Sequence, residues 1–186
     1  MLRTLENSRS KPRHLLAWLS LLLFVGVVRG EGPSAPPEPS KVTIQGQEFY
    51  ALGFDKLSAF NYVVTDAGTG ASEAEIEAAR KKDQIPNWVH FYSEKRAVLT
   101  GYLLPLQVEK GLAKKLILMK DQSTCCFGAT PRMNDYVVVT MKEGIEPIQD
   151  IPVSMTGVVH ISEQYENGMV VSLFQFDGEK FLGAKK

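Results

Sequence analysis

The chain has 186 residues, of which 44% are hydrophobic and 23% are charged, and its 21 Lys and Arg balance 21 Asp and Glu. This length and apolar content suit a single domain with an adequate core, and two cysteines are too few for a disulfide-built scaffold. The balanced charge argues against the basic surface by which proteins neutralise nucleic-acid phosphates.

Residues 1–30 have the pattern of a secretory signal peptide. Four basic residues and one acid in residues 1–14 precede the apolar run LLAWLSLLLFVGVV, which is shorter than the roughly 20 residues of a membrane-spanning helix. Small residues around Gly30 predict cleavage after that position. We therefore expect export to the periplasm or the extracellular space. The alternative is an uncleaved leader that anchors the protein in the inner membrane, which would be its one contact with a membrane.

Cleavage would make the chain acidic. Removing the five basic residues and one acid of the leader leaves 16 Lys and Arg against 20 Asp and Glu. Such a balance predicts no nucleic-acid partner. The next segment, residues 31–40 (EGPSAPPEPS), is rich in proline and is predicted to be an extended linker.

Residues 41–84 are predicted to form an N-terminal extension of the main domain. Apolar and polar residues alternate around Val42, which indicates a short strand, and the apolar group that begins at Phe54 indicates a packed turn or helical bend. Ser72, with a glutamate three positions later, has the pattern of a capping box. We therefore predict one short helix over residues 73–82.

Residues 85–186 are predicted to be a β domain. Five runs of β-branched, aromatic and aliphatic residues are separated by Gly, Pro, Asn or Asp. These predicted strands are residues 97–104, 115–119, 136–141, 153–161 and 169–176. Asn167-Gly168 is a strong hairpin signal, although the polar residues 162–166 suggest a longer connection. Gly101 and Gly157 end similar motifs and are expected where barrel strands bend. The fold class is therefore mainly β, with one short helix and a small OB-like, partly open barrel.

No established reaction signature is present in the sequence. A nucleophile elbow, a P-loop and a His-Glu-x-x-His zinc motif are all missing. Gly68-Thr-Gly70 resembles the start of a dinucleotide-binding motif, but Glu73 at the third glycine position would repel a pyrophosphate. After the leader only His90 and His160 remain, and both are expected to have surface or packing roles. We therefore expect a protein that is not an enzyme.

The chemically interesting segment is Cys125-Cys126-Phe127-Gly128, with Pro131 and Asn134 shaping the turn that follows. Adjacent Cα atoms lie about 3.8 Å apart, whereas a relaxed disulfide needs about 4.4–6.8 Å, so a bond between these cysteines would be strained and labile. Three alternatives remain: inert packing, a bond to another chain, or ligation of zinc or copper. A metal site could be completed by residues from the set His90, His160, Asp121 and Asp135.

Several motifs in this order resemble one family. They are Ile85-Pro-x-x-Val89, Val98-x-x-Gly-Tyr-Leu-Leu-Pro-Leu106, the Cys-Cys-Phe-Gly segment, and Pro152-Val-x-x-Thr-Gly157. Together they resemble the exported bacterial family catalogued as domain of unknown function thirty-two ninety-nine, over roughly residues 41–182. The resemblance implies an exported bacterial protein with a compact β domain, and it implies no activity. Some members have a histidine two positions after the first cysteine, where this chain has Phe127, which argues against carrying a metal site over.

Two functional hypotheses follow. The first is a non-enzymatic envelope module that binds an envelope protein or a small ligand through its barrel face or its Cys-Cys loop, without a cofactor. The second is an envelope protein that handles electrons or a soft metal, zinc or copper, through Cys125 and Cys126.

Overall fold

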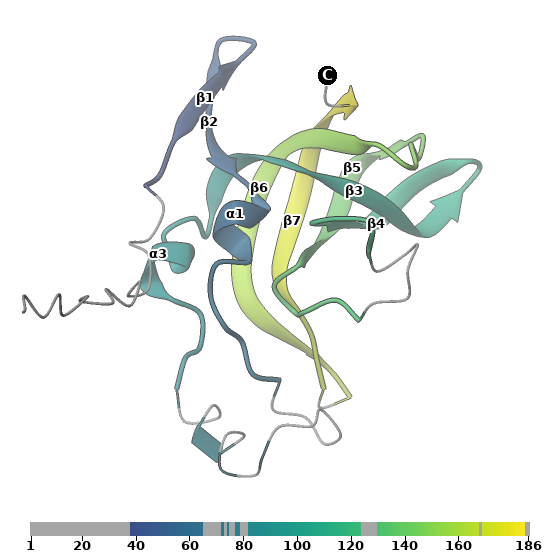
Figure 1. Cartoon of the computed structure of the whole chain (residues 1–186). Helices are drawn as coiled ribbons and strands as arrows, with labels where there is room; N and C mark the ends of the chain where they lie inside the picture. Colours follow the sequence, from purple (N-terminus) through teal and green to yellow (C-terminus); the bar gives the residue numbers. More distant parts are fainter. Residues whose placement is uncertain are drawn as a thin grey trace, which may run out of the picture. The chain divides into compact units, whose positions relative to one another are not determined.

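The strands dominate the protein, as the sequence predicts. The computed structural model describes residues 38–64, 72, 74, 77–78, 82–123, 130–167 and 169–184. The described residues form seven strands and two four-residue helices (Figure 1). The strands are β1 (Lys41–Ile44), β2 (Gln47–Leu52), β3 (Lys95–Glu109), β4 (Leu112–Met119), β5 (Tyr136–Ile145), β6 (Pro152–Glu166) and β7 (Met169–Ala184). The helices are α1 (Phe54–Leu57) and α3 (Asn87–His90).

Five strands form a ring of hydrogen-bonded neighbours. Their order is β3-β4-β5-β7-β6, and β6 pairs again with β3. The β5–β7 pair is parallel and the other pairs of the ring are antiparallel. β2 adds to β3 in parallel, and β1 pairs with β2 in a hairpin. The mainly β class is confirmed, and the ring-like bonding agrees with the partly open, OB-like arrangement that we predicted.

All five predicted strands of the β domain are present, and each is longer than predicted. One expectation about their connections was wrong. Residues 162–166 continue β6 as far as Glu166 and β7 begins at Met169, so Asn167 and Gly168 alone connect these strands. Asn167 has φ 52°, a left-handed conformation that asparagine tolerates and that a tight hairpin turn requires. The polar residues therefore belong to a strand whose end is exposed to solvent.

The N-terminal extension contributes strands to the same sheet. β1 and β2 replace the single short strand expected there, and α1 is the helical bend expected at Phe54. The helix predicted over residues 73–82 falls largely outside the described residues. Of its few described residues, Ala74, Glu77 and Ala78 are helical and Lys82 is not. The helices α1 and α3 lie outside this range, at 54–57 and 87–90.

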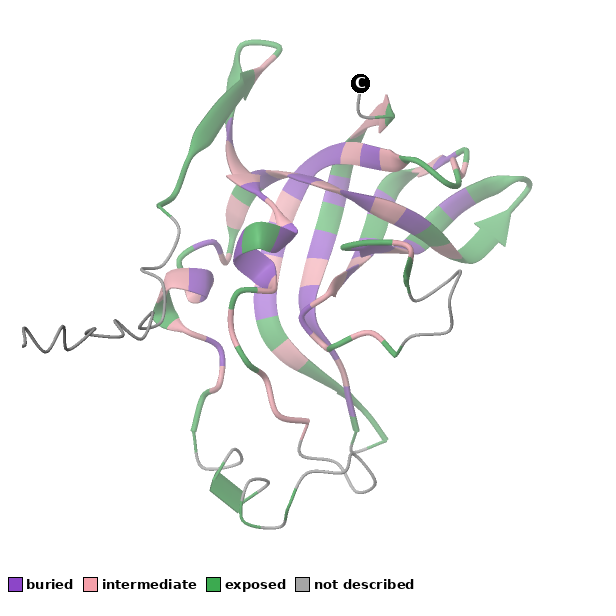
Figure 2. Ribbon diagram, viewed as in Figure 1, coloured by how far each residue is buried: buried purple, intermediate pink, exposed green. Residues whose placement is uncertain are grey.

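The core lies inside the ring of strands. Alternate residues of each strand are buried, which Figure 2 shows as bands along β6 and β7. Each fully buried Leu, Val or Phe side chain stabilises the fold by roughly 1.5–3 kcal/mol. Side chains with no exposed surface come from all five strands of the ring, and they include Leu99, Leu116, Leu118, Val139, Val153, Leu173 and Phe174.

The two similar glycine motifs lie beside each other. β3 and β6 pair so that Ala97 faces Gly157 and Gly101 faces Val153. A Cβ atom at Gly101 would lie 2.7 Å from the carbonyl oxygen of Met119, and one at Gly157 would lie 2.1 Å from that of Asp177. Glycine is required at both positions because neighbouring backbones approach too closely for a side chain.

Candidate ligand-binding groove

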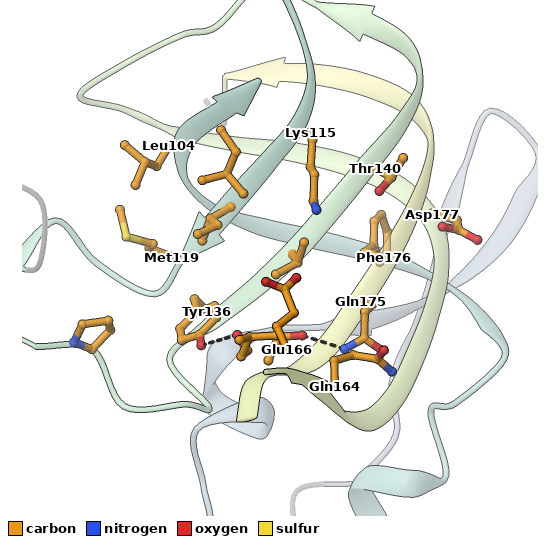
Figure 3. A pocket seen from close by; sticks show the side chains of 16 residues that line it. Leu104, Lys115, Met119, Tyr136, Thr140, Gln164, Glu166, Gln175, Phe176 and Asp177 are labelled. Carbon is orange, nitrogen blue, oxygen red and sulfur yellow. Dashed lines mark hydrogen bonds between the residues drawn. The ribbon is translucent and has the colours of Figure 1, made fainter. Parts of the chain in front are cut away.

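A groove with a volume of about 570 Å³ lies on the face of β4 and β5 that points away from the core (Figure 3). This volume is within the range of about 300–1,000 Å³ that small-molecule sites occupy. β4 alternates between the two faces, since Leu116 and Leu118 point into the core while Lys115, Ile117 and Met119 line the groove. On β5 the same alternation buries Val137 and Val139. The residues that line the groove are Leu104, Leu106, Lys115, Ile117, Met119, Pro131, Tyr136, Val138, Thr140, Gln164, Glu166, Val171, Ser172, Gln175, Phe176 and Asp177.

Strand register arranges these side chains in two rows. Leu104 faces Ile117, which faces Val138, which faces Gln175, so the first row is apolar along most of its length. In the second row, Lys115 faces Thr140 on β5, and Thr140 faces Asp177 on β7. Because paired strands lie about 4.8 Å apart, each row crosses the sheet as a line of adjacent side chains. The groove therefore has an apolar floor beside a row of polar and charged groups.

Part of the groove lies where β5 and β7 separate, since Tyr136, Val171 and Ser172 line it. These strands pair only between Val138–Met141 and Gln175–Gly178. Beyond the pairing, the Tyr136 hydroxyl donates a hydrogen bond to the carbonyl oxygen of Val171 at 2.8 Å. Burial raises the pKa of Tyr136, so the hydroxyl keeps its proton and its donor role. This bond connects the two strands across the gap and holds the floor of the groove together.

Amide side chains from the β6–β7 hairpin lie along one wall. The Gln175 Nε2 donates to the Ser172 Oγ at 2.7 Å, and the Gln164 Nε2 donates to the Ser162 Oγ at 3.0 Å. Each of these amides has further donors or acceptors that a ligand can use. Figure 3 shows Gln164 and Glu166 on the side of the groove opposite the Lys115 strand.

The acid at the end of the polar row is paired with a histidine. The His160 Nε2 lies 2.9 Å from an Asp177 carboxylate oxygen, and the His160 Nδ1 lies 2.7 Å from a Glu94 carboxylate oxygen. Both ring nitrogens can donate only in the protonated imidazole. The hydrogen bond to Glu94, with that to Asp177, raises the pKa of His160. Protonated His160 offsets only one of these two carboxylates, so the group of Glu94, His160 and Asp177 keeps a net negative charge.

The sequence singled out six residues, and the structure describes two of them. Pro131 lines the groove, and Asn134 is a buried anchor, 1% exposed. The Asn134 Nδ2 donates to the carbonyl oxygen of Phe60 at 2.7 Å, and the Ser58 hydroxyl donates to the carbonyl oxygen of Asn134 at 3.0 Å. Asn134 thus ties its loop to the segment after α1. Cys125, Cys126, Phe127 and Gly128 lie outside the described residues, so their sulfur chemistry stays a prediction.

The side chains proposed to complete a metal site have other partners. His90 lies 2.9 Å from Asp83, and Asp135 accepts two hydrogen bonds of 2.8 Å from Arg132. Asp121 accepts bonds from the backbone and the hydroxyl of Ser123, and His160 is held by its two carboxylates. Within the described ranges, no group of three or more His, Cys, Asp and Glu side chains could hold a metal ion.

Most of the residues that line the groove were not predicted from the sequence. A signal was present, because the runs KLILM (115–119) and YVVVT (136–140) carry apolar residues on both faces of a strand. A strand covered on one side should alternate apolar with polar residues, so this excess predicts a second apolar surface. Ile117 and Val138 supply that surface.

Comparisons with known proteins support the fold. The chain is similar to the crystal structure of a DUF3299 family protein from Pseudomonas aeruginosa PAO1, with a TM-score of 0.51 and 18% sequence identity. The match covers 73% of this chain and 96% of the other. The fold is that of a DUF3299 family protein. The resemblance inferred from the sequence motifs is thus confirmed at the level of the fold. No protein-family model and no curated protein matches the chain.

A shared fold does not determine a function, which depends on the side chains of a particular site. No helix in the described ranges has both the length and the apolar character needed to cross a bilayer.

Proposed function

We propose that this protein is an exported, non-enzymatic binding module and that the groove on β4 and β5 is its ligand site. The observation that carries the proposal is the position of the groove in the ring. β4 and β5 are the second and third strands of the ring, and the β3–β4 and β6–β7 hairpins flank them. In OB-folds the same face and the two corresponding loops bind ligands. That correspondence is an analogy between folds, to which this chain adds a cavity of suitable size.

The chemistry of the groove favours binding over catalysis. Its polar groups are one lysine, two carboxylates, two amides, a threonine, a serine and a tyrosine, placed around aliphatic side chains. The histidine nearest to it is held between Glu94 and Asp177, so its ring nitrogens are not available to activate a nucleophile. Export is supported by the leader, and the acidic mature chain favours a ligand other than nucleic acid.

The proposal is tested by filling the groove. Thr140 lies in the polar row, and Thr140→Trp would place a large ring above Lys115 and Ile117. Lys142 is two positions further along β5, exposed and outside the groove, so Lys142→Trp is the matched control. The probe is the fraction of small molecules extracted from the bacterial envelope. Its binding is measured as a shift in melting temperature and by native mass spectrometry.

A ligand at about ten times its Kd stabilises the folded state by about 1.4 kcal/mol. For a domain of this size that is a shift of about 3–6 °C. We expect the shift and a bound mass in the wild type and in Lys142→Trp, and neither in Thr140→Trp. A wild type without a shift or a bound mass would contradict the proposal, and so would a Thr140→Trp variant that binds normally.

A further inference from the structure

Lys115 is placed to receive an anion. Among the described residues that line the groove it is the single basic one, and it extends from β4 over the apolar floor (Figure 3). Within the part of the chain that the structure describes, Lys115 forms no ion pair and no side-chain hydrogen bond. Its row continues through Thr140, which carries no charge, to Asp177, which His160 holds at 2.9 Å. An ammonium group without an acidic partner above an apolar surface is a suitable partner for a ligand carboxylate.

Glu166 has the opposite character on the other side of the groove. It is the last residue of β6, where it faces Met169 across the hairpin turn. Its carboxylate points into the groove toward Lys115 in Figure 3. The Glu166 carboxylate also has no hydrogen-bond or ion-pair partner among the described residues. The second acid of the groove, Asp177, differs because His160 holds it at 2.9 Å.

These two charges discriminate between ligand classes. A simple anion such as a fatty acid would be attracted by Lys115 but repelled by Glu166. A simple cation would be attracted by Glu166 but repelled by Lys115. A ligand that carries both an anionic and a cationic group can satisfy both side chains together. The row beside that of Lys115 contains Ile117 and Val138, whose aliphatic surfaces suit an apolar side chain.

We propose that the groove binds a small zwitterion of the amino-acid or short-peptide class. The carboxylate of the ligand contacts Lys115, its ammonium group contacts Glu166, and its apolar side chain lies on Ile117 and Val138. This inference rests on the proposed function, since it names the ligand class of the same groove.

The experiment uses leucine, leucyl-leucine and trileucine as probes, because they differ in the distance between the two charges. Binding to the purified protein is measured by isothermal titration calorimetry at neutral pH. The tightest probe is then measured with its amine acetylated and, separately, with its carboxylate amidated. We expect each modification to weaken binding at least tenfold, because each removes a charge-assisted hydrogen bond.

Variants assign each charge of the ligand to one side chain. In Lys115→Gln, amidation should weaken binding less than twofold while acetylation keeps its full effect. In Glu166→Gln the pattern should be reversed. Lys114→Gln and Glu143→Gln are matched controls, since both residues are exposed on β4 and β5, outside the groove, and these variants should bind like the wild type. Circular dichroism is used to check that all four variants fold.

The measurements distinguish a wrong ligand class from a groove that binds no ligand. Equal affinity for free and modified probes would overturn the zwitterion, and so would variants that respond equally to both modifications. If no leucine probe binds although the envelope extract raises the melting temperature of the wild type, the ligand class is wrong and the groove remains a ligand site. If neither the probes nor the extract binds, both proposals fall.

Discussion

Replacing Gly157 by alanine tests how closely the backbones of β6 and β7 approach each other. The added Cβ would lie 2.1 Å from the carbonyl oxygen of Asp177 and 2.7 Å from a ring carbon of Phe176. Cβ atoms in proteins essentially never come within 3.0 Å of another atom, so β6 and β7 would have to separate by about 0.9 Å at this point. The carbonyl belongs to the backbone, and no side-chain rotation can relieve the contact.

The cost of Gly157→Ala follows from that displacement. Hydrogen bonds of about 2.9 Å stretched by about 0.9 Å are no longer effective, and losing two of them costs about 1–3 kcal/mol. Phe176 is 1% exposed, so moving its ring strains the core by a further 1–3 kcal/mol or so. We therefore expect a loss of about 4 kcal/mol in the free energy of unfolding, a large part of the 5–15 kcal/mol that is typical of domains.

Urea unfolding followed by circular dichroism measures this loss, and Gly183→Ala is the control. Gly183 belongs to the same β6–β7 ladder, opposite Ser154, but nothing lies within 4 Å of the position its Cβ would take. Its φ of 88° is unfavourable for alanine and should cost only about 1–2 kcal/mol. A Gly157→Ala variant no less stable than Gly183→Ala would refute the reasoning from close backbone approach.

Two further predictions concern polar contacts. Asn134→Ala should lower the free energy of unfolding by about 1–3 kcal/mol in urea titration, because it leaves the Phe60 carbonyl without its donor; a loss below about 0.5 kcal/mol would contradict the anchor role. The pKa of His160 is raised above its ordinary value of about 6.5, so the stability that His160 contributes is complete below that pH and is lost as the pH rises through the raised pKa of the folded state. His160→Gln should therefore flatten the decline in melting temperature as the pH rises above about 6.5, and an unchanged slope would show that the contacts with Glu94 and Asp177 do not stabilise the fold.

Local patterns in the sequence were sufficient for the elements of the ring. In each strand alternate side chains point into the core, so the apolar periodicity can be recognised in the sequence without knowing which strands pair. Asn167 marked the hairpin correctly because its left-handed conformation is a property of that residue and its turn. The polarity of residues 162–166 placed the end of β6 too early. These residues continue the strand beyond its pairing with β3, where it has no need of an apolar face.

The groove depends on register, which a single sequence does not display. Lys115, Thr140 and Asp177 lie in one row only because β4 pairs with β5 and β5 pairs in parallel with β7. Glu166 lies opposite Lys115 because the β6–β7 hairpin returns to that face (Figure 3). Residue periodicity follows from the geometry of one strand, whereas a binding site needs side chains from strands far apart in the chain. The strands could thus be read from residue order, whereas the groove and its pair of opposite charges required the pairing of strands around the ring.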